Sequence, residues 1–145
     1  MNIETISGID ASASQAWSVF GDGFGDWAQW SGGIEKSTLG GPLAEGVMRT
    51  NDTRALGVVT QELTHFDAGS RSLTYEFKSG LPAFLRGARN EWIIEDLGSD
   101  CSRIVGHASF DVAWWARPLT PLLRRKMAAS LQGFAAECAA HVKGA

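Results

Sequence analysis

The chain of 145 residues has few cysteines and no long hydrophobic run. Its two cysteines, Cys101 and Cys138, are too few for a disulfide-stabilised scaffold, and we interpret both as free thiols of a reducing compartment. No stretch reaches the ~18 consecutive apolar residues of a transmembrane helix. The first residues also lack a basic leader followed by an apolar run. We therefore expect a cytoplasmic protein without a transmembrane segment.

Concentrated positive charge is also scarce. The 13 basic and 16 acidic residues are mixed along the chain and give a net charge of −3, and residues 124–126 form the only basic run. A phosphate backbone requires a concentrated positive face, so the sequence argues against a nucleic-acid partner. We interpret the basic run as a solvated helix face, with binding of an anion as the alternative.

The familiar signatures of metal, nucleotide and nucleophile chemistry are missing. His65, His107 and His141 lie far apart, and neither cysteine is next to a histidine, so the sequence predicts no metal site. There is no Gly-x-Ser-x-Gly motif, no nucleotide-binding loop and no glycine fingerprint after a strand. We therefore expect no cofactor and assign no catalytic residue.

What the chain does have is the composition of one globular domain, with 44% hydrophobic residues and no internal repeat or linker. We expect a single domain over residues 1–145. Residues 121–142 have the clearest periodicity, because apolar side chains recur there at steps of three and four. This stripe consists of Leu123, Met127, Leu131, Phe134 and Cys138. It predicts a long amphipathic helix, capped by Thr120 and with Pro121 in its first turn.

The remaining chain predicts an antiparallel sheet that covers this helix. Residues 2–9 alternate as a first strand, and two short helices follow, one from Asp10 or Ser12 to Phe20 and one over 24–30. Short runs rich in β-branched and aromatic residues then predict strands at 34–39, 47–53, 57–66, 72–78, 86–97 and 102–114. The expected fold is α+β, a curved seven-stranded antiparallel sheet wrapped around a long C-terminal helix. Because Gly106 and Ala108 on the inward face are small, we also expect a cavity.

Several short motifs, in this order, resemble one known family. They are Ile-Asp-Ala-Ser-Ala at 9–13 followed by Trp17, Trp-Ala-Gln-Trp at 27–30, Gly-Val-Met-Arg at 46–49, Thr-Gln-Glu-Leu at 60–63 with Asp67, Leu-Thr-Tyr at 73–75, and Gly-Leu-Pro at 80–82. Over nearly the whole chain they resemble the START-like, or SRPBCC, superfamily, in particular its polyketide cyclase/dehydrase-like branch. The resemblance implies a helix-grip fold with a hydrophobic cavity for a small apolar or amphipathic ligand, as in polyketide cyclases, lipid carriers and hormone receptors. Family members often carry an inward Glu where this chain has Gln61, so that role is not carried over.

The polar candidates for chemistry in such a cavity are Arg49, Gln61, Glu62, Tyr75 and Asn90. Arg49 and Gln61 fall on neighbouring predicted strands, where a cation and an amide facing inward would orient a carboxylate or carbonyl group. The alternative is that Arg49 is the buried ion-pair partner of Glu62 or Glu45. Tyr75 shares a face with apolar neighbours, which favours a core position over a general acid.

We predict a pocket formed by residues from every element that faces the cavity. It consists of Trp30, Arg49, Gln61, Tyr75, Phe84, Trp92, Phe110, Met127 and Leu131. Aromatic walls suit ring-bearing ligands and equally suit a core, and we favour the core for Trp17 and Trp92. Residues 79–86 carry the apolar pair Phe84 and Leu85 and are interpreted as a lid that engages ligand, a partner protein or a second subunit in a homodimer.

The sequence leaves three functions open. The lack of a convincing acid–base pair favours a carrier or sensor that binds a small hydrophobic or amphipathic molecule, such as a lipid, over catalysis. The alternative is a polyketide cyclase, dehydratase or aromatase. A weaker alternative is a protein-interaction module that uses the lid.

Overall fold

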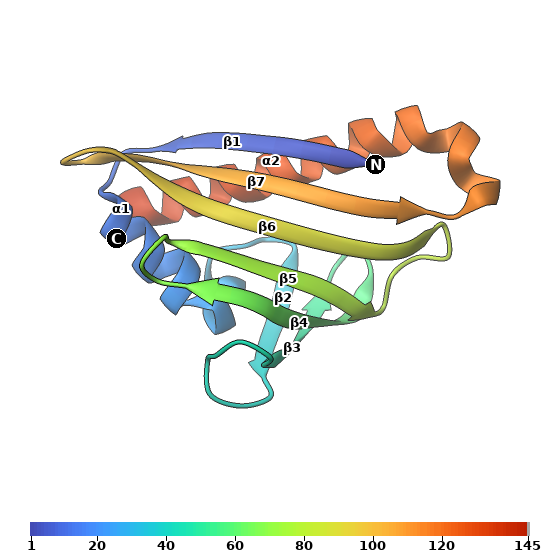
Figure 1. The fold of residues 1–145 in the computed structure, drawn as a ribbon, viewed down its shortest axis with the longest axis horizontal. Coiled ribbons are helices and arrows are strands. Elements are labelled where there is room, and N and C mark those ends of the chain that lie inside the picture. The colour runs from blue at the N-terminus through green and yellow to red at the C-terminus, as the bar shows by residue number, and fades with distance from the viewer. Residues whose placement is uncertain (145) are drawn as a thin grey trace.

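The sheet of this protein has seven antiparallel strands in the order β1-β7-β6-β5-β4-β3-β2, so the first two strands in the chain form its edges. The computed structural model describes residues 1–144. The strands are β1 (Asn2–Ile9), β2 (Ile34–Leu39), β3 (Met48–Thr53), β4 (Gly57–Asp67), β5 (Ser72–Ser79), β6 (Leu85–Gly98) and β7 (Cys101–Val112). Figure 1 shows the strands side by side with the long helix α2 (Thr120–Gly144) running behind β1. The predicted α+β helix-grip fold is confirmed.

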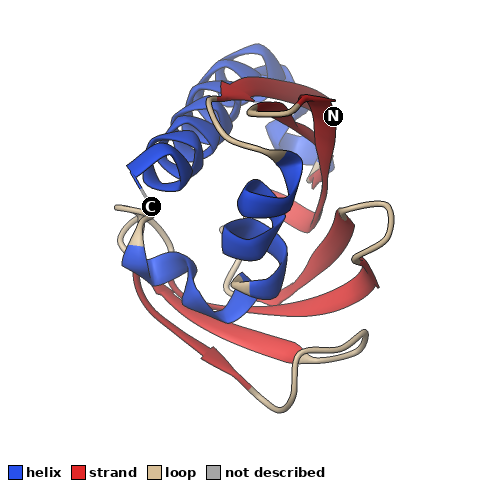
Figure 2. Cartoon of the chain, turned by 90° about the vertical axis from the view of Figure 1, so that its left-hand side faces the viewer, coloured by secondary structure: helices blue, strands red, loops and turns tan. Residues whose placement is uncertain are grey.

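Three short helical segments lie between β1 and β2. They are α1 (Ala13–Trp17), the π-helical turn η1 (Ser18–Asp22) and the 3-10 helix η2 (Phe24–Gln29). Of the two predicted starts, Ser12 is the N-cap, because its Oγ accepts the Gln15 N–H while the Gln15 side chain accepts the Ser12 N–H. In Figure 2 the strands curve around one side of the molecule and the helices occupy the other. Within residues 1–144, no helix is long and apolar enough to cross a membrane.

The apolar stripe of α2 has two different halves. In its C-terminal half, Ala135, Cys138 and Val142 are fully buried against the rest of the core. In its N-terminal half, Leu123 and Met127 are only half-buried. Burial raises the pKa of the Cys138 thiol to about 12, since the interior disfavours a thiolate. The helix therefore anchors the fold at one end and leaves apolar side chains available at the other.

An aromatic cluster joins the short helices to α2 and the sheet. The Phe20 ring stacks on Trp27 at 4.5 Å between centroids, and the Phe134 ring of α2 lies 5.2 Å from Trp27 and 5.5 Å from Trp92. The Trp27 indole N–H donates to the Phe20 carbonyl at 3.0 Å, which satisfies the polar atom of this buried ring. These contacts fix the short helices over one end of the concave face.

Three sequence-based expectations are wrong. Gly106 does not leave space empty, because it lies opposite Trp92 in the β6–β7 register and the Trp92 ring covers it so closely that a Cβ would overlap the ring. Leu85 does not belong to a lid, since it begins β6 and is buried. Trp114 does not extend the last strand inward. β7 ends at Val112, which pairs with Leu85 at the start of β6, and Trp114 begins the 3-10 helix η3 (Trp114–Leu119).

Candidate functional site

A cavity of about 570 Å³ lies between the concave face of the sheet and α2. Its apolar lining includes Trp27, Ile34, Val59, Phe77, Leu131 and Phe134. A second lobe of about 310 Å³ adjoins it and shares several lining residues with it, including Leu56, Phe77 and Leu131. Together the two lobes are large enough for a small organic molecule.

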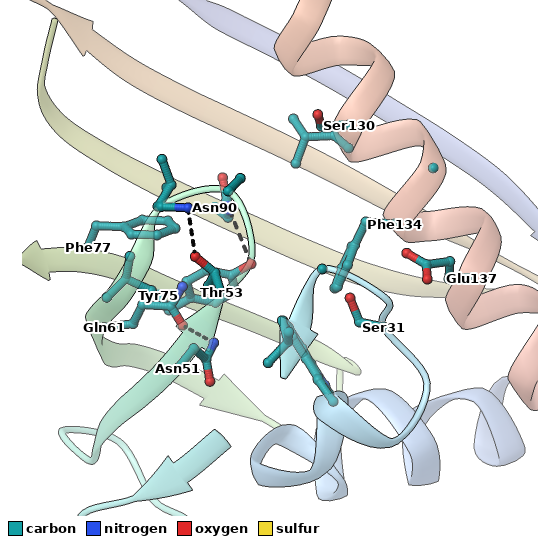
Figure 3. Close-up of a pocket in the computed structure, with 18 of the residues that line it drawn as sticks. Ser31, Asn51, Thr53, Gln61, Tyr75, Phe77, Asn90, Ser130, Phe134 and Glu137 are labelled. Atoms are coloured by element: carbon teal, nitrogen blue, oxygen red, sulfur yellow. Dashed lines mark hydrogen bonds between the residues drawn. The ribbon is translucent and has the colours of Figure 1, made fainter. Parts of the chain in front are cut away.

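Polar side chains from four neighbouring strands meet on one wall of the main lobe. They are Arg49 and Asn51 on β3, Gln61 on β4, Tyr75 on β5 and Asn90 on β6, and all five are buried. Arg49 lies opposite Gln61 in the β3–β4 register, and Tyr75 lies opposite Asn90 in the β5–β6 register. Since side chains two residues apart share a strand face, Arg49 and Asn51 point the same way. Figure 3 shows Asn51, Gln61, Tyr75 and Asn90 of this wall across the cavity from Phe134 and Glu137 of α2.

Arg49 is the most unusual member, because its long cationic side chain is only 1% exposed. Its Nε donates to Gln61 Oε1 at 2.9 Å, its Nη2 donates to the same oxygen, and its Nη1 donates to the Phe24 carbonyl at 2.8 Å. Its guanidinium carbon lies 3.7 Å, 4.2 Å and 5.1 Å from the ring centroids of Phe24, Trp27 and Tyr75. The cation is therefore held by carbonyl oxygens and aromatic faces.

The predicted alternative, a buried ion pair with Glu62 or Glu45, is wrong. No carboxylate within residues 1–144 lies within 4.0 Å of the Arg49 guanidinium. Glu62 follows Gln61 on the strand and so points to the opposite face, where Lys78 Nζ lies 3.6 Å away. Glu45 instead lies 3.7 Å from His65 Nδ1.

The guanidinium keeps its charge at neutral pH despite this environment. Burial lowers the pKa of Arg49 from 12.5 to about 10, while the nearby Tyr75 hydroxyl acts in the opposite direction. Three of the five N–H groups of an arginine are used in the bonds to Gln61 and Phe24. The cavity wall thus presents a full positive charge, and no carboxylate within residues 1–144 lies within 4.0 Å of it.

The Tyr75 hydroxyl is the second polar centre. Its oxygen accepts from Asn90 Nδ2 at 3.1 Å and from the Trp92 indole N–H at 3.3 Å, which leaves the hydroxyl proton for another acceptor. Two buried acceptors, Asn51 Oδ1 and Asn90 Oδ1, have no donor among the residues that the structure describes. Such an unpaired group costs about 1–3 kcal/mol, so these oxygens lower stability unless another molecule donates to them.

Glu137 is the one carboxylate among the described lining residues of the main lobe. It projects from α2, and its Oε2 accepts the Gly32 backbone N–H at 2.6 Å. This bond ties the turn before β2 to the helix. Sequence reasoning missed Glu137 because the rotation of α2 over the sheet depends on tertiary packing.

The structure separates the predicted pocket residues into three groups. Arg49, Gln61, Tyr75 and Leu131 line the main lobe, and Phe84, Phe110, Met127 and again Leu131 line the second lobe. Trp30 and Trp92 line neither lobe. Trp92 covers Gly106, and Trp30 packs against Phe134 with 5.0 Å between ring centroids.

Sequence reasoning also missed several lining residues. Asn51, Phe77 and Phe134 line the main lobe. Asn51 carried a usable signal, because it lies two residues after Arg49 and therefore on the same strand face. Among the described residues, no group of three or more His, Cys, Asp or Glu side chains is arranged to hold a metal ion.

The chain was compared with protein families and with known proteins. A sequence model of the family described as polyketide cyclase / dehydrase and lipid transport matches residues 3–143. A search of curated protein sequences finds no significant match.

Several solved structures share the fold at low sequence identity. An uncharacterised protein from Bacillus thuringiensis aligns with a TM-score of 0.79 and 16% identity, covering 100% of both chains. Norcoclaurine synthase from Thalictrum flavum, solved with dopamine and hydroxybenzaldehyde, aligns with a TM-score of 0.76 and 16% identity, covering 98% of this chain and 86% of that one. Ara h 8.0201 aligns with a TM-score of 0.77 and 13% identity, covering 100% of this chain and 99% of that one. At these identities the likeness establishes the fold alone.

Proposed function

The chain belongs to the polyketide cyclase/dehydrase and lipid transport family, and on this basis we propose that it binds a small amphipathic molecule in its cavity, as a carrier or sensor. The apolar body of the ligand occupies the space under α2, and its polar head meets the wall formed by Arg49, Gln61 and Tyr75. The fold class alone is compatible with many functions, so the proposal depends on the chemistry of this wall.

The observation that carries the proposal is the buried charge of Arg49. A charge removed from water is costly unless it is paired, and no carboxylate within residues 1–144 pairs with it. An anionic oxygen of a ligand would supply the missing partner through the N–H groups that remain. The head group is therefore a carboxylate, a phenolate or another acidic oxygen.

The two unpaired amide oxygens add a second requirement. Asn51 Oδ1 and Asn90 Oδ1 are buried acceptors without a donor among the described residues. A ligand hydroxyl or N–H near the acidic head would satisfy one of them and remove a cost of about 1–3 kcal/mol. The preferred ligand thus combines an acidic oxygen, a nearby donor and an apolar body.

Catalysis by a cyclase or dehydratase is the second candidate, and one observation favours it. The Tyr75 hydroxyl accepts two hydrogen bonds, so its O–H is free to donate to a carbonyl oxygen that lies beside Arg49. A reaction would also need a base. Glu137, the only carboxylate among the described lining residues of the main lobe, is bonded to Gly32. Binding without chemistry therefore fits the wall better.

The cavity is tested by filling it. Ser130 faces both lobes from α2, so Ser130→Phe should block a ligand with little effect on the fold. The probe is anilinonaphthalene sulfonate, an anionic aromatic molecule, titrated by fluorescence. We expect saturable binding to the native protein and a loss of at least about tenfold in affinity for Ser130→Phe.

Ala136→Phe is the matched control. It adds the same ring to an exposed position on the same helix, which lines neither lobe. The control should bind the probe as the native protein does. Equal affinities for all three proteins would place the probe outside the cavity and refute the proposal.

A further inference from the structure

Four large apolar side chains are exposed together where β7 leads into α2. Trp114 is 70% exposed, Trp115 and Leu119 are 52% exposed, and Leu122 is 55% exposed. Figure 1 shows this turn, in orange, projecting beyond the ends of β6 and β7. Exposed apolar side chains that gather at one place mark an interaction site, whereas single ones need no explanation.

The same segment carries a local excess of positive charge. Residues 112–136 contain four basic side chains and no acidic one, in a chain whose net charge is −3. The four are Arg117, Arg124, Arg125 and Lys126. Arg125 and Lys126 follow Leu122 by three and four residues, so they share its side of the helix. Arg124, at the edge of this surface, donates to the Asn2 carbonyl at 2.6 Å.

We propose that this corner, formed by Trp114, Trp115, Leu119, Leu122 and the four basic residues, docks on an anionic lipid bilayer. Tryptophan rings and leucine side chains enter the boundary between head groups and acyl chains, while arginine and lysine remain beside the head groups. Negative lipids attract each basic side chain near the surface. The combination of exposed indoles with unopposed cations fits such a boundary.

A second copy of the chain fits this surface less well. A two-fold dimer sets the same patch against itself. The four cations of one copy would then face the four cations of the other, and like charges across an interface are unfavourable. The charge of the patch therefore selects a negative partner.

The docking surface also adjoins the cavity. Lys126 belongs to the surface and lines the second lobe next to Met127. An amphipathic molecule in the bilayer would therefore enter or leave near the surface that touches the membrane. Docking itself does not require a ligand, so it stands or falls separately from the function proposed above.

The test is flotation of the ligand-free protein with vesicles. One vesicle contains phosphatidylcholine alone, and the other also contains phosphatidylglycerol. The native protein should float with the anionic vesicles and much less with the neutral ones. Trp114→Ala/Trp115→Ala should lower the partition coefficient at least about tenfold. Arg117→Gln/Arg125→Gln should lower the partition coefficient about 25-fold, because each basic side chain that is lost should lower it about fivefold.

Two variants at other surfaces serve as controls. Leu97→Ala removes an equally exposed apolar side chain at the opposite end of β6, and Lys36→Gln removes an exposed charge on β2. Both should float as the native protein does. Failure of the native protein to float with anionic vesicles would overturn the proposal. A second outcome would also overturn it. In this outcome light scattering shows that the native protein is a dimer and that Trp114→Ala/Trp115→Ala is a monomer, while flotation of the two proteins is the same.

Discussion

Arg49 shows how this fold accommodates a charge in its interior. Three of its N–H groups are bonded to the Gln61 side chain and the Phe24 carbonyl, and three aromatic rings surround the guanidinium. These partners stabilise the cation without neutralising it. The residue is therefore kept charged and available, which is what the binding of an acidic group requires.

The stability of Arg49→Met tests whether a carboxylate pairs with Arg49. Arg49→Met is expected to lower the free energy of unfolding at neutral pH by only about 1–3 kcal/mol, because it leaves the Phe24 carbonyl without its donor. Gln61 Oε1 keeps a contact with Asn51 Nδ2 at 3.4 Å. Urea denaturation measures the difference. A loss of about 5 kcal/mol, typical of a broken buried ion pair, would mean that a carboxylate does pair with Arg49.

The pH dependence of the same variant gives a second expectation. The folded-state pKa of Arg49, about 10, is below the ordinary value of 12.5, so above pH 10 the unfolded chain holds this proton more tightly. The free energy of unfolding of the native protein should therefore rise relative to that of Arg49→Met as the pH increases through this window. The Cys138 thiol, with its pKa raised by burial, acts in the opposite direction but is present in both proteins. A difference that stays constant between pH 8 and about 11 would contradict the lowered pKa.

At the residue scale, the sequence predicted which strand face a side chain takes better than it predicted which groups that side chain contacts. Alternation within the strands placed Arg49 and Gln61 on the inward face, and the structure lines the main lobe with both. The sequence did not predict that Arg49 lacks a carboxylate, because that depends on which face Glu62 takes and on the register between strands. Trp92 likewise alternates inward, but its ring covers Gly106 on the neighbouring strand and not the cavity.

At the scale of elements, the pair β6–β7 depends on one glycine. Gly106 lies directly opposite Trp92, and a Cβ there would overlap the indole ring. Gly106→Ala is expected to lower the free energy of unfolding by about 1–3 kcal/mol, as overpacking does. Gly87→Ala on β6 is the matched control, since its Cβ would meet Asp111 Cβ at an ordinary 3.8 Å. Chemical denaturation that gives equal small losses for both would show that the ring moves freely.

The Phe134 ring packs helix α2 against the short helices and β6. The ring lies within about 6 Å, between centroids, of Phe20, Trp27, Trp30 and Trp92. Phe134→Ala is expected to cost about 3–5 kcal/mol in unfolding free energy, as truncation of a packed aromatic does. Leu122→Ala, at an exposed position of the same helix, should cost under about 0.5 kcal/mol. A loss under about 1 kcal/mol for Phe134→Ala would mean that the ring carries little of the packing.

An element could be predicted well when its apolar repeat extended over many residues. Nearly two dozen residues of α2 repeat at three and four, and the predicted bounds differ from the observed helix by one or two residues. The short helix η3 gave no such signal, because its six residues, one of them a proline, contain only about two turns of pattern. Trp114 was therefore placed at the end of a strand, and its exposure became visible only in three dimensions.

At the scale of the whole molecule, the curved sheet, α2 and the short helices leave an interior that is not filled. The C-terminal half of α2 packs tightly, while its N-terminal half covers the two lobes. Four strands then contribute a polar wall that a purely structural core would not contain. The unpaired acceptors lower stability, and a molecule bound beside them and Arg49 would raise it.

The central claim is that Arg49 recognises the acidic head of an apolar ligand. It is tested by titrating two probes of almost the same shape, anilinonaphthalene sulfonate, which is anionic, and phenylnaphthylamine, which is neutral. Arg49→Met should weaken the anionic probe by about 1.5–3 kcal/mol, the contribution of a hydrogen bond to a charged group. It should leave the neutral probe unchanged.

Arg89→Met, which removes an exposed charge from the same sheet, is the control and should affect neither probe. Isothermal titration calorimetry on the three proteins gives the comparison directly. Selective loss of the anionic probe in Arg49→Met is the result that this account expects. Equal losses for both probes, or none for either, would contradict it, because Arg49 would then shape the interior without binding an acidic group.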